Sequence, residues 1–275
     1  MNNLFSKSLL SLSLFSGGLV FVFFFFLGYL CLNLFSNIDF FNLFSFDWDE
    51  YSNSYGILIM VIGTIIISFN ALVLGFIFSI SLAISIFLLK NKYLKFIFEK
   101  TILIMSAVPT VIYAFSALLL IVPFVSAFKP SSTLSIFIAS ITLSLLLVPT
   151  MSLFFLNIFN NLSAKYQGSF LTLGLTKEQF LFNFILKQSY KNILSGVILA
   201  LSRAIGDTMI ALMLAGNALV LPHSIFDSTR TLTSHIALIF ANDYNSFAFQ
   251  AVFLSAFLLL SSNFILILLL KRLNK

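Results

Sequence analysis

Residues 57–89 read ILIMVIGTIIISFNALVLGFIFSISLAISIFLL and contain no charged side chain. A helix needs about 20 consecutive apolar residues to cross the hydrocarbon core of a bilayer. The run is longer than one crossing requires, but it is too short for two crossings joined by a turn. We therefore expect one tilted membrane-spanning helix that extends beyond the bilayer.

The same pattern recurs along the rest of the chain. Hydrophobic residues make up 60% of the 275-residue sequence and charged residues only 9%, too few to form the surface of a soluble domain. Helices are expected in these runs, because lipid cannot satisfy open backbone groups. We predict an all-α membrane protein with a single domain over residues 1–275. Its six candidate spans are residues 9–34, 57–89, 101–125, 134–159, 193–217 and 247–270.

The positive charges orient these spans. Of the 15 Lys and Arg residues, Lys129 and Arg230 lie on one side, Arg203 lies within a span, and all the others lie on the opposite side. Enrichment in Lys and Arg marks the cytoplasmic side, so both termini are predicted to be cytoplasmic. Omitting the span at 193–217 would move Lys271 and Arg272 to the wrong side and break this pattern.

The longest cytoplasmic connection is the loop at residues 160–192. Gly174 is suited to end a helix, because glycine adopts a left-handed backbone cheaply. Thr176 and Gln179 have the spacing of a capping box that begins a new helix. We predict a helix, a turn at Gly174, and a second helix that carries Phe180, Phe184 and Ile185. By these features alone, an amphipathic hairpin on the membrane surface is an equal alternative.

The span at 193–217 carries two charged residues, Arg203 and Asp207. Each costs roughly 2.5–3.5 kcal/mol at the centre of a membrane helix. The i,i+4 spacing places them on one helical face, where they can pair. The same face carries the small residues Gly196, Ala200 and Ala211, which allow close approach of a neighbouring helix or a water-filled path. One interpretation is a structural ion pair; the other is that Arg203 lines an anion route, because a guanidinium stays charged and matches oxyanion geometry.

The cytoplasmic loop resembles that of the membrane subunits of ABC importers. Leu173-Gly174-Leu175-Thr176 is similar to the family's Leu-Gly-Ala-Thr core, and Phe184-Ile185-Leu186 falls at its Ile-x-Leu position. Gly168-Ser169-Phe170 stands where the family has Glu-Ala-Ala, and Lys187 replaces its proline. The resemblance implies a type I ABC importer permease fold, with a coupling helix that docks on a separate ATPase. The coupling residues would be Gly168, Phe170, Leu171, Gly174 and Thr176.

Several further segments resemble phosphate-importer permeases of the PstC and PstA type. Arg203–Thr208 is similar to the family's Gly-Arg-Ala-x-Gly-Glu-Thr after its first glycine, with Asp207 in place of Glu. Other similar segments, in the family's order, are Phe46–Asp49, Ala107–Tyr113, Ala215–Asn217 and Phe226–Thr233. The region of Trp48 and the segment Phe226–Thr233 favour PstC over PstA. The resemblance implies that Arg203, Asp207 and Thr208 line the phosphate pathway.

These observations imply a transport subunit of the bacterial inner membrane, not an enzyme. The sequence has no Gly-x-x-x-x-Gly-Lys-Ser/Thr loop, so no cofactor is expected in this chain, and ATP and Mg²⁺ would bind a partner ATPase. The expected partners are a second homologous permease, an ATPase dimer, a periplasmic phosphate-binding protein and membrane lipid, but not nucleic acid. The alternatives are a permease for sulfate, molybdate or tungstate, and an ATP-independent anion carrier.

Two histidines and one aromatic stretch also stand out in the sequence. His223 and His235 are 12 residues apart with no cysteine cluster, so no metal site is predicted. The acidic and aromatic stretch from Asp47 to Tyr55 is either an interfacial anchor at headgroup depth or a contact for a periplasmic binding protein.

Overall fold

The computed structural model describes residues 2–37, 40–49, 52, 54–129, 133–172, 174–240 and 247–273. Five of its helices are long and apolar enough to cross a membrane, within Ser6–Leu32, Leu58–Leu88, Thr110–Phe128, Ile136–Lys165 and Ala251–Leu273. They belong to α1 (Asn2–Asn37), α3 (Leu58–Leu88), α5 (Thr110–Phe128), α6 (Ile136–Lys165) and α13 (Phe247–Leu273). Each of them overlaps a predicted span.

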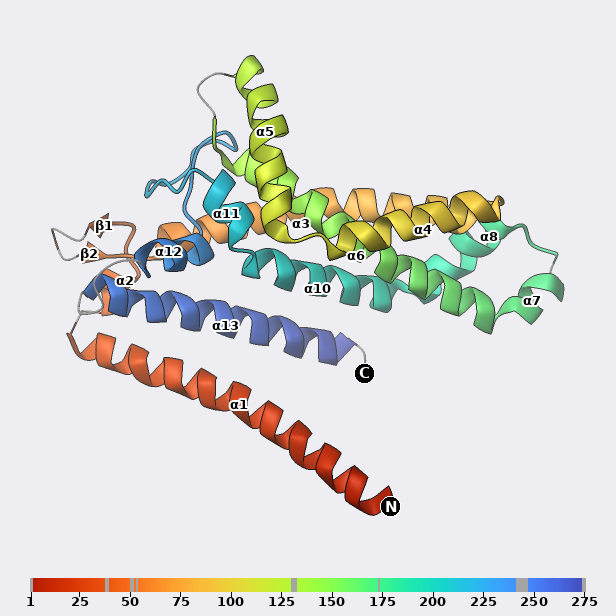
Figure 1. Cartoon of the computed structure of the whole chain (residues 1–275), viewed down its shortest axis with the longest axis horizontal. Coiled ribbons are helices and arrows are strands. Elements are labelled where there is room, and N and C mark those ends of the chain that lie inside the picture. The colour runs from red at the N-terminus through yellow and green to blue at the C-terminus, as the bar shows by residue number, and fades with distance from the viewer. Residues whose placement is uncertain are drawn as a thin grey trace.

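The third predicted span is a helix pair with a break in the middle. α4 (Lys92–Ala107) begins after Asn91, whose side chain accepts hydrogen bonds from the Tyr93 and Leu94 amides. Val108 is extended, with φ −67° and ψ 130°, and α5 starts only after Pro109. The residue before a proline avoids helical geometry, and proline itself has no N–H to continue the ladder. As a result α5 turns away from the axis of α4 (Figure 1).

The fifth predicted span is also interrupted. α10 (Tyr190–Gly206) is followed by the short α11 (Met209–Leu214). Asp207, between them, has φ −73° and ψ 124°, so its backbone is extended rather than helical. The prediction of one continuous helix over 193–217 therefore fails at Gly206 and Asp207, and α11 turns away from α10 (Figure 1).

The core is formed mainly by α3 packed against α6. Ser79 donates a hydrogen bond to the Val148 carbonyl at 3.3 Å, and Ser152 donates to the Ser79 carbonyl at 3.2 Å. These hydroxyls are buried, so the bonds satisfy polar groups that would otherwise be costly in an apolar interior. α13 and α1 lie on the side of the bundle away from α4 and α5 (Figure 1). The described side chains of α1 are exposed along almost the whole helix.

The remaining elements are short and lie at the two ends of the bundle. One end carries α2 (Phe40–Leu43), the antiparallel strands β1 (Trp48–Asp49) and β2 (Ser54–Tyr55), and α12 (Leu232–Ile239) (Figure 1). The other end carries α7 (Gln167–Thr172), α8 (Lys177–Phe180), the π-helical η1 (Leu181–Ile185) and α9 (Leu186–Gln188). Both termini point toward this second end, as the charge pattern predicts for the cytoplasmic side (Figure 1).

Candidate functional site

Arg203 lies in the last turn of α10 and borders a cavity of ≈ 200 Å³ between α10 and α6. The other lining residues are Thr150, Met151 and Phe154 of α6, and Gly196, Leu199 and Ala200 of α10. A side chain at Gly196 would place its Cβ 2.6 Å from the Phe154 ring and 2.9 Å from the Phe155 ring. The predicted small-residue face of α10 therefore serves helix packing and lines the cavity at the same time.

The predicted ion pair between Arg203 and Asp207 is not present. Within the described part of the chain, an ion pair within 4 Å is recorded for Lys95 and Glu99 but not for Arg203 and Asp207. The i,i+4 geometry requires an unbroken helix, and the helix ends at Gly206. Next to Arg203, the Ser202 hydroxyl donates a hydrogen bond to Asn263 Oδ1 of α13 at 2.6 Å. This bond joins the end of α10 to α13.

Asp207 has a different role in the break. Its Oδ1 accepts a hydrogen bond from the Ile210 amide at 2.8 Å, which satisfies a free N–H in the first turn of α11. Its carbonyl accepts a hydrogen bond from the Thr233 hydroxyl at 2.9 Å. Thr208, the third predicted pathway residue, is partly buried at the start of α11, and its side chain makes no capping hydrogen bond there.

Asp207 borders a second cavity that is only ≈ 10 Å³, about the size of one water molecule. Its polar lining comes from three separate parts of the chain: Thr64 and Ser68 on α3, Asp207 in the break, and Thr231 and Thr233 at the start of α12. Arg203 and Asp207 thus open to different cavities. The sequence indicated Thr231 and Thr233 through a motif, but gave no signal for Thr64 and Ser68, which lie in an unbroken apolar run.

The loop after α11 folds back over the break. Gly216 and Asn217 both have positive φ, 81° and 57°, which turns the chain sharply. Arg230 Nε donates to the Asn217 carbonyl at 3.2 Å, and the Leu232 amide donates to Thr64 Oγ1 at 2.9 Å. The segment at residues 229–233 is therefore fastened both to the loop and to α3.

The cytoplasmic loop has the predicted form of two helices with a turn at Gly174, whose φ is 59°. Thr176 Oγ1 accepts from the Gln179 amide at 3.2 Å, and Gln179 Oε1 accepts from the Thr176 amide at 3.0 Å, so the predicted capping box is confirmed. Gly168 and Gly174 are exposed, with open space where a Cβ would lie. Phe170 and Leu171 belong to α7, but their side chains lie outside the described residues.

The second helix of this loop is packed into the bundle rather than lying free on a membrane surface. Phe180, Leu181 and Ile185 are buried in the core that also contains α3 and α6. Phe184 stacks on Phe180 at 5.4 Å between ring centroids, and Tyr166 at the end of α6 packs on Phe184 at 4.8 Å. The second helix of the loop is therefore part of the same core as the spanning helices α3 and α6.

The two histidines lie in different environments. No cluster of three or more potential ligands exists among the described residues. His223 is exposed, and its amide, like that of Ser224, donates to Asp227 Oδ2 at 2.8 Å. His235 is fully buried, with its ring 4.2 Å from that of Trp48. Burial, and secondarily the charge of Arg230, lowers the pKa of His235 to about 3.

The chain belongs to the family described as binding-protein-dependent transport system inner membrane component, whose model matches residues 73–275. It is therefore a multi-pass protein of the bacterial inner membrane, and such permease subunits are not themselves enzymes.

Two relatives illustrate the similarity in sequence. The phosphate transport system permease protein PstC of Pasteurella multocida is 28% identical over 231 residues, 77% of this chain and 71% of that protein. The probable ABC transporter permease protein YqgH of Bacillus subtilis is 27% identical over 241 residues, 87% of this chain and 78% of that protein.

The fold is similar to that of a chain of the MetNI methionine ABC transporter, in a structure described as inward-facing. The TM-score is 0.60 at 14% identity, over 78% of this chain and 93% of that one. The predicted type I importer permease fold is thereby confirmed.

Proposed function

We propose that this chain is the permease subunit of an ATP-driven inorganic phosphate importer and forms half of its translocation path. Relatives named as the phosphate transport system permease protein PstC support the choice of phosphate. In the proposed mechanism of alternating access, a periplasmic binding protein delivers phosphate. A partner ATPase dimer binds ATP and Mg²⁺ and moves the cytoplasmic loop, while a second permease completes the path.

The observation that carries the proposal is Arg203 beside its cavity. The guanidinium is half-buried, borders ≈ 200 Å³ of space, and forms no ion pair within 4 Å among the described residues. Because about 10–15 Å³ admits one water, the cavity has room for a small hydrated anion. A guanidinium presents paired donors that match the oxygens of a tetrahedral oxyanion. Apart from Arg203 and Thr150 the lining is apolar, which favours a weak site, as a transport path requires.

In this mechanism Asp207 and Thr208 act on the pathway through the helix break. Asp207 accepts hydrogen bonds from the Ile210 amide of α11 and from the Thr233 hydroxyl. These bonds would fix the angle between α10 and α11, and with it the position of Arg203 at the end of α10. Gly168, Phe170, Leu171, Gly174 and Thr176 would form the surface that meets the ATPase. Loss of the family's glutamate near Gly168 leaves apolar contacts, through Phe170 and Leu171, as the means of docking.

The test is phosphate uptake by the complete complex in proteoliposomes. We expect Arg203→Gln to assemble and to lose at least tenfold in uptake rate, because one charge-assisted contact to the anion is removed. Ser202→Ala is the matched control, since Ser202 contacts Asn263 rather than the cavity, and it should transport normally. Unaltered uptake in an assembled Arg203→Gln complex would remove Arg203 from the pathway.

Two competing functions are separated by the same assay. A permease for sulfate, molybdate or tungstate would show uptake that is inhibited by that oxyanion and not by phosphate. An ATP-independent carrier would purify without an ATP-hydrolysing subunit and would transport without ATP. Either result would replace phosphate import as the function.

A further inference from the structure

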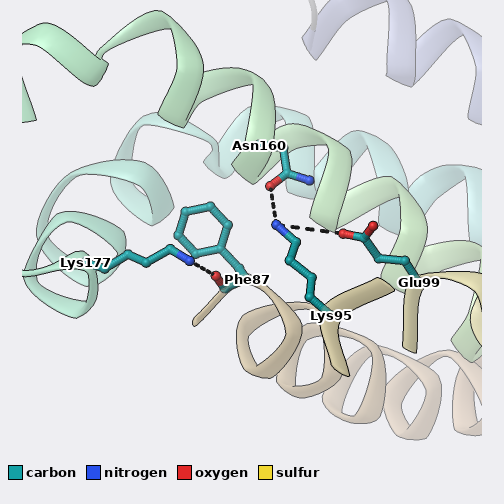
Figure 2. A network of polar contacts seen from close by, with 5 residues as sticks. All are labelled: Phe87, Lys95, Glu99, Asn160 and Lys177. Atoms are coloured by element: carbon teal, nitrogen blue, oxygen red, sulfur yellow. Dashed lines mark hydrogen bonds and ion pairs between the residues drawn. The ribbon is translucent and has the colours of Figure 1, made fainter. Parts of the chain in front are cut away.

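Lys177, the first residue of α8, reaches across to the cytoplasmic end of α3 (Figure 2). Its Nζ donates a hydrogen bond to the main-chain carbonyl of Phe87 and lies 4.8 Å from the centroid of the Phe87 ring. The contact joins two segments that are 90 residues apart in the sequence. It links the turn predicted to meet the ATPase directly to a membrane-spanning helix.

The chemistry of this contact fits the end of a helix. The last four carbonyls of an α-helix have no partner within the helix and carry partial negative charge. The Leu89 amide, just beyond α3, bonds to the Ser85 and Ile86 carbonyls, and the Phe87 carbonyl is taken by Lys177. A cation at this position stabilises the helix end and is itself stabilised by it.

Lys177 is not an ordinary solvated surface lysine. It is partly buried, and this burial, together with the nearby charge of Lys95, lowers its pKa. No ion pair is recorded for Lys177 among the described residues, whereas Glu99 pairs with Lys95 at 3.8 Å. The partly desolvated ammonium group therefore depends on the α3 carbonyl and the Phe87 ring for compensation.

A second polar contact fastens the neighbouring helices at the same place. Lys95 of α4 donates to Asn160 Oδ1 of α6 at 3.5 Å, beside its ion pair with Glu99 (Figure 2). The buried Phe87 ring also packs edge-on against Phe159 of α6, with centroids 6.0 Å apart. Thus the cytoplasmic end of α3 is held between α6 and α8, with α4 tied to α6 alongside.

The far end of α3 lies at the helix break. Thr64 and Ser68 on α3 line the small cavity at Asp207, and Thr64 accepts the Leu232 amide at 2.9 Å. Thr64 and Phe87 are 23 positions apart on α3, which corresponds to about 35 Å of helix at 1.5 Å per residue. α3 therefore connects the cytoplasmic loop to the interrupted helix as one continuous rod.

We propose that Lys177 is a positioning residue for energy coupling: it fastens α8 to the end of α3, so that displacement of the cytoplasmic loop moves α3 and, through it, the helix break at Asp207. This inference rests on the proposed function, because the coupled step is ATP-driven transport. The rival explanation is that the apolar contacts of Phe180, Leu181 and Ile185 transmit the movement without Lys177.

The experiment measures transport and ATP hydrolysis together in the complete complex in proteoliposomes. Lys177→Met keeps the apolar stem but removes the charge and the donors, whereas Lys177→Arg keeps both. Lys187→Met is the matched control, because Lys187 lies on the same loop, is exposed, and has no hydrogen bond recorded in the described structure. The quantity compared is the number of phosphate ions moved per ATP hydrolysed.

We expect Lys177→Met to hydrolyse ATP at close to the normal rate and to move about tenfold less phosphate per ATP, as loss of one charge-assisted hydrogen bond would produce. Lys177→Arg should recover most of the ratio, and Lys187→Met should not change it. A normal ratio in Lys177→Met would overturn the inference. A low ratio of phosphate to ATP in an assembled Lys177→Arg complex would also overturn the inference. This second comparison provides the test if the Lys177→Met variant does not assemble.

The two proposals fail in different ways in this experiment. Absence of phosphate uptake by the unmodified complex refutes the proposed substrate alone. The Lys177 comparison is then made with the oxyanion that the unmodified complex does transport, found by the competition assay above. A ratio unaffected by Lys177→Met with that oxyanion refutes the coupling role alone.

Discussion

Gly63 provides a sharp test of how the helix break is held in place. It lies on α3 where the helix contacts the segment at residues 229–233. A Cβ at this position would overlap the Arg230 carbonyl oxygen and lie 2.7 Å from Thr229 Oγ1. The overlap with Arg230 is with backbone, which cannot rotate away as a side chain could. Gly63→Ala must therefore push the segment off α3.

The expected cost follows from this geometry. Overpacking a tight interior contact costs about 1–3 kcal/mol, and a backbone neighbour places Gly63→Ala near the upper value. The displaced segment also carries the Leu232 amide bonded to Thr64 and the Thr233 hydroxyl bonded to the Asp207 carbonyl. For a chain of this size, about 3 kcal/mol corresponds to a decrease in Tm of about 6–12 °C.

The assay is thermal unfolding of the purified complex in detergent. Gly17→Ala is the matched control, because Gly17 lies within α1 and has open space where its Cβ would be. Replacing a glycine inside a helix by alanine should stabilise by about 0.5–1 kcal/mol when nothing obstructs the methyl group. If Gly63→Ala and Gly17→Ala shifted Tm alike, the close approach of residues 229–230 to α3 would be refuted.

Three further outcomes are expected. The pKa of His235 is about 3 in the folded protein and about 6.5 in the unfolded chain. Its contribution to stability is therefore complete above pH 6.5. That contribution decreases by up to about 1.4 kcal/mol per pH unit as the pH falls toward 3. His235→Phe should flatten the stability–pH curve in that range, and an unchanged slope would contradict its burial as a neutral ring. Asp207→Ala should destabilise by about 0.5–2 kcal/mol in thermal unfolding through loss of the bond to the Ile210 amide, and Asp207→Asn by less, because the acceptor remains. Equal losses in the two variants would show that the carboxylate charge matters rather than the cap. Thr176→Ala should cost about 0.5–2 kcal/mol and speed hydrogen exchange at the start of α8, whereas unchanged exchange would show that the capping box is not needed there.

The sequence predicted those features that depend on local chemistry. Uncharged runs located five helices that are long and apolar enough to cross a membrane, because the bilayer accepts only long apolar segments with internally bonded backbone. The turn at Gly174 and the capping box at Thr176 were predicted for the same reason, since both are set by the residues involved and their immediate neighbours. Each of these features is present in the structure.

What the sequence could not determine depends on contacts between distant residues. The i,i+4 spacing of Arg203 and Asp207 indicated a pair, but the chain leaves the helix at Gly206, where Asp207 caps α11 and binds Thr233 instead. Local spacing predicts contacts only while the helix continues.

The sequence by itself determined that this is a multi-spanning membrane protein, because hydrophobic run length and charge placement are properties of the chain alone. Only the tertiary structure decided that Arg203 and Asp207 border different cavities and that Lys177 donates a hydrogen bond to the Phe87 carbonyl at the end of α3. The physical reason is that a charge buried in the fold takes its partner from whichever groups packing brings near it. Here those groups are main-chain amides and carbonyls, which every residue carries and no sequence motif marks.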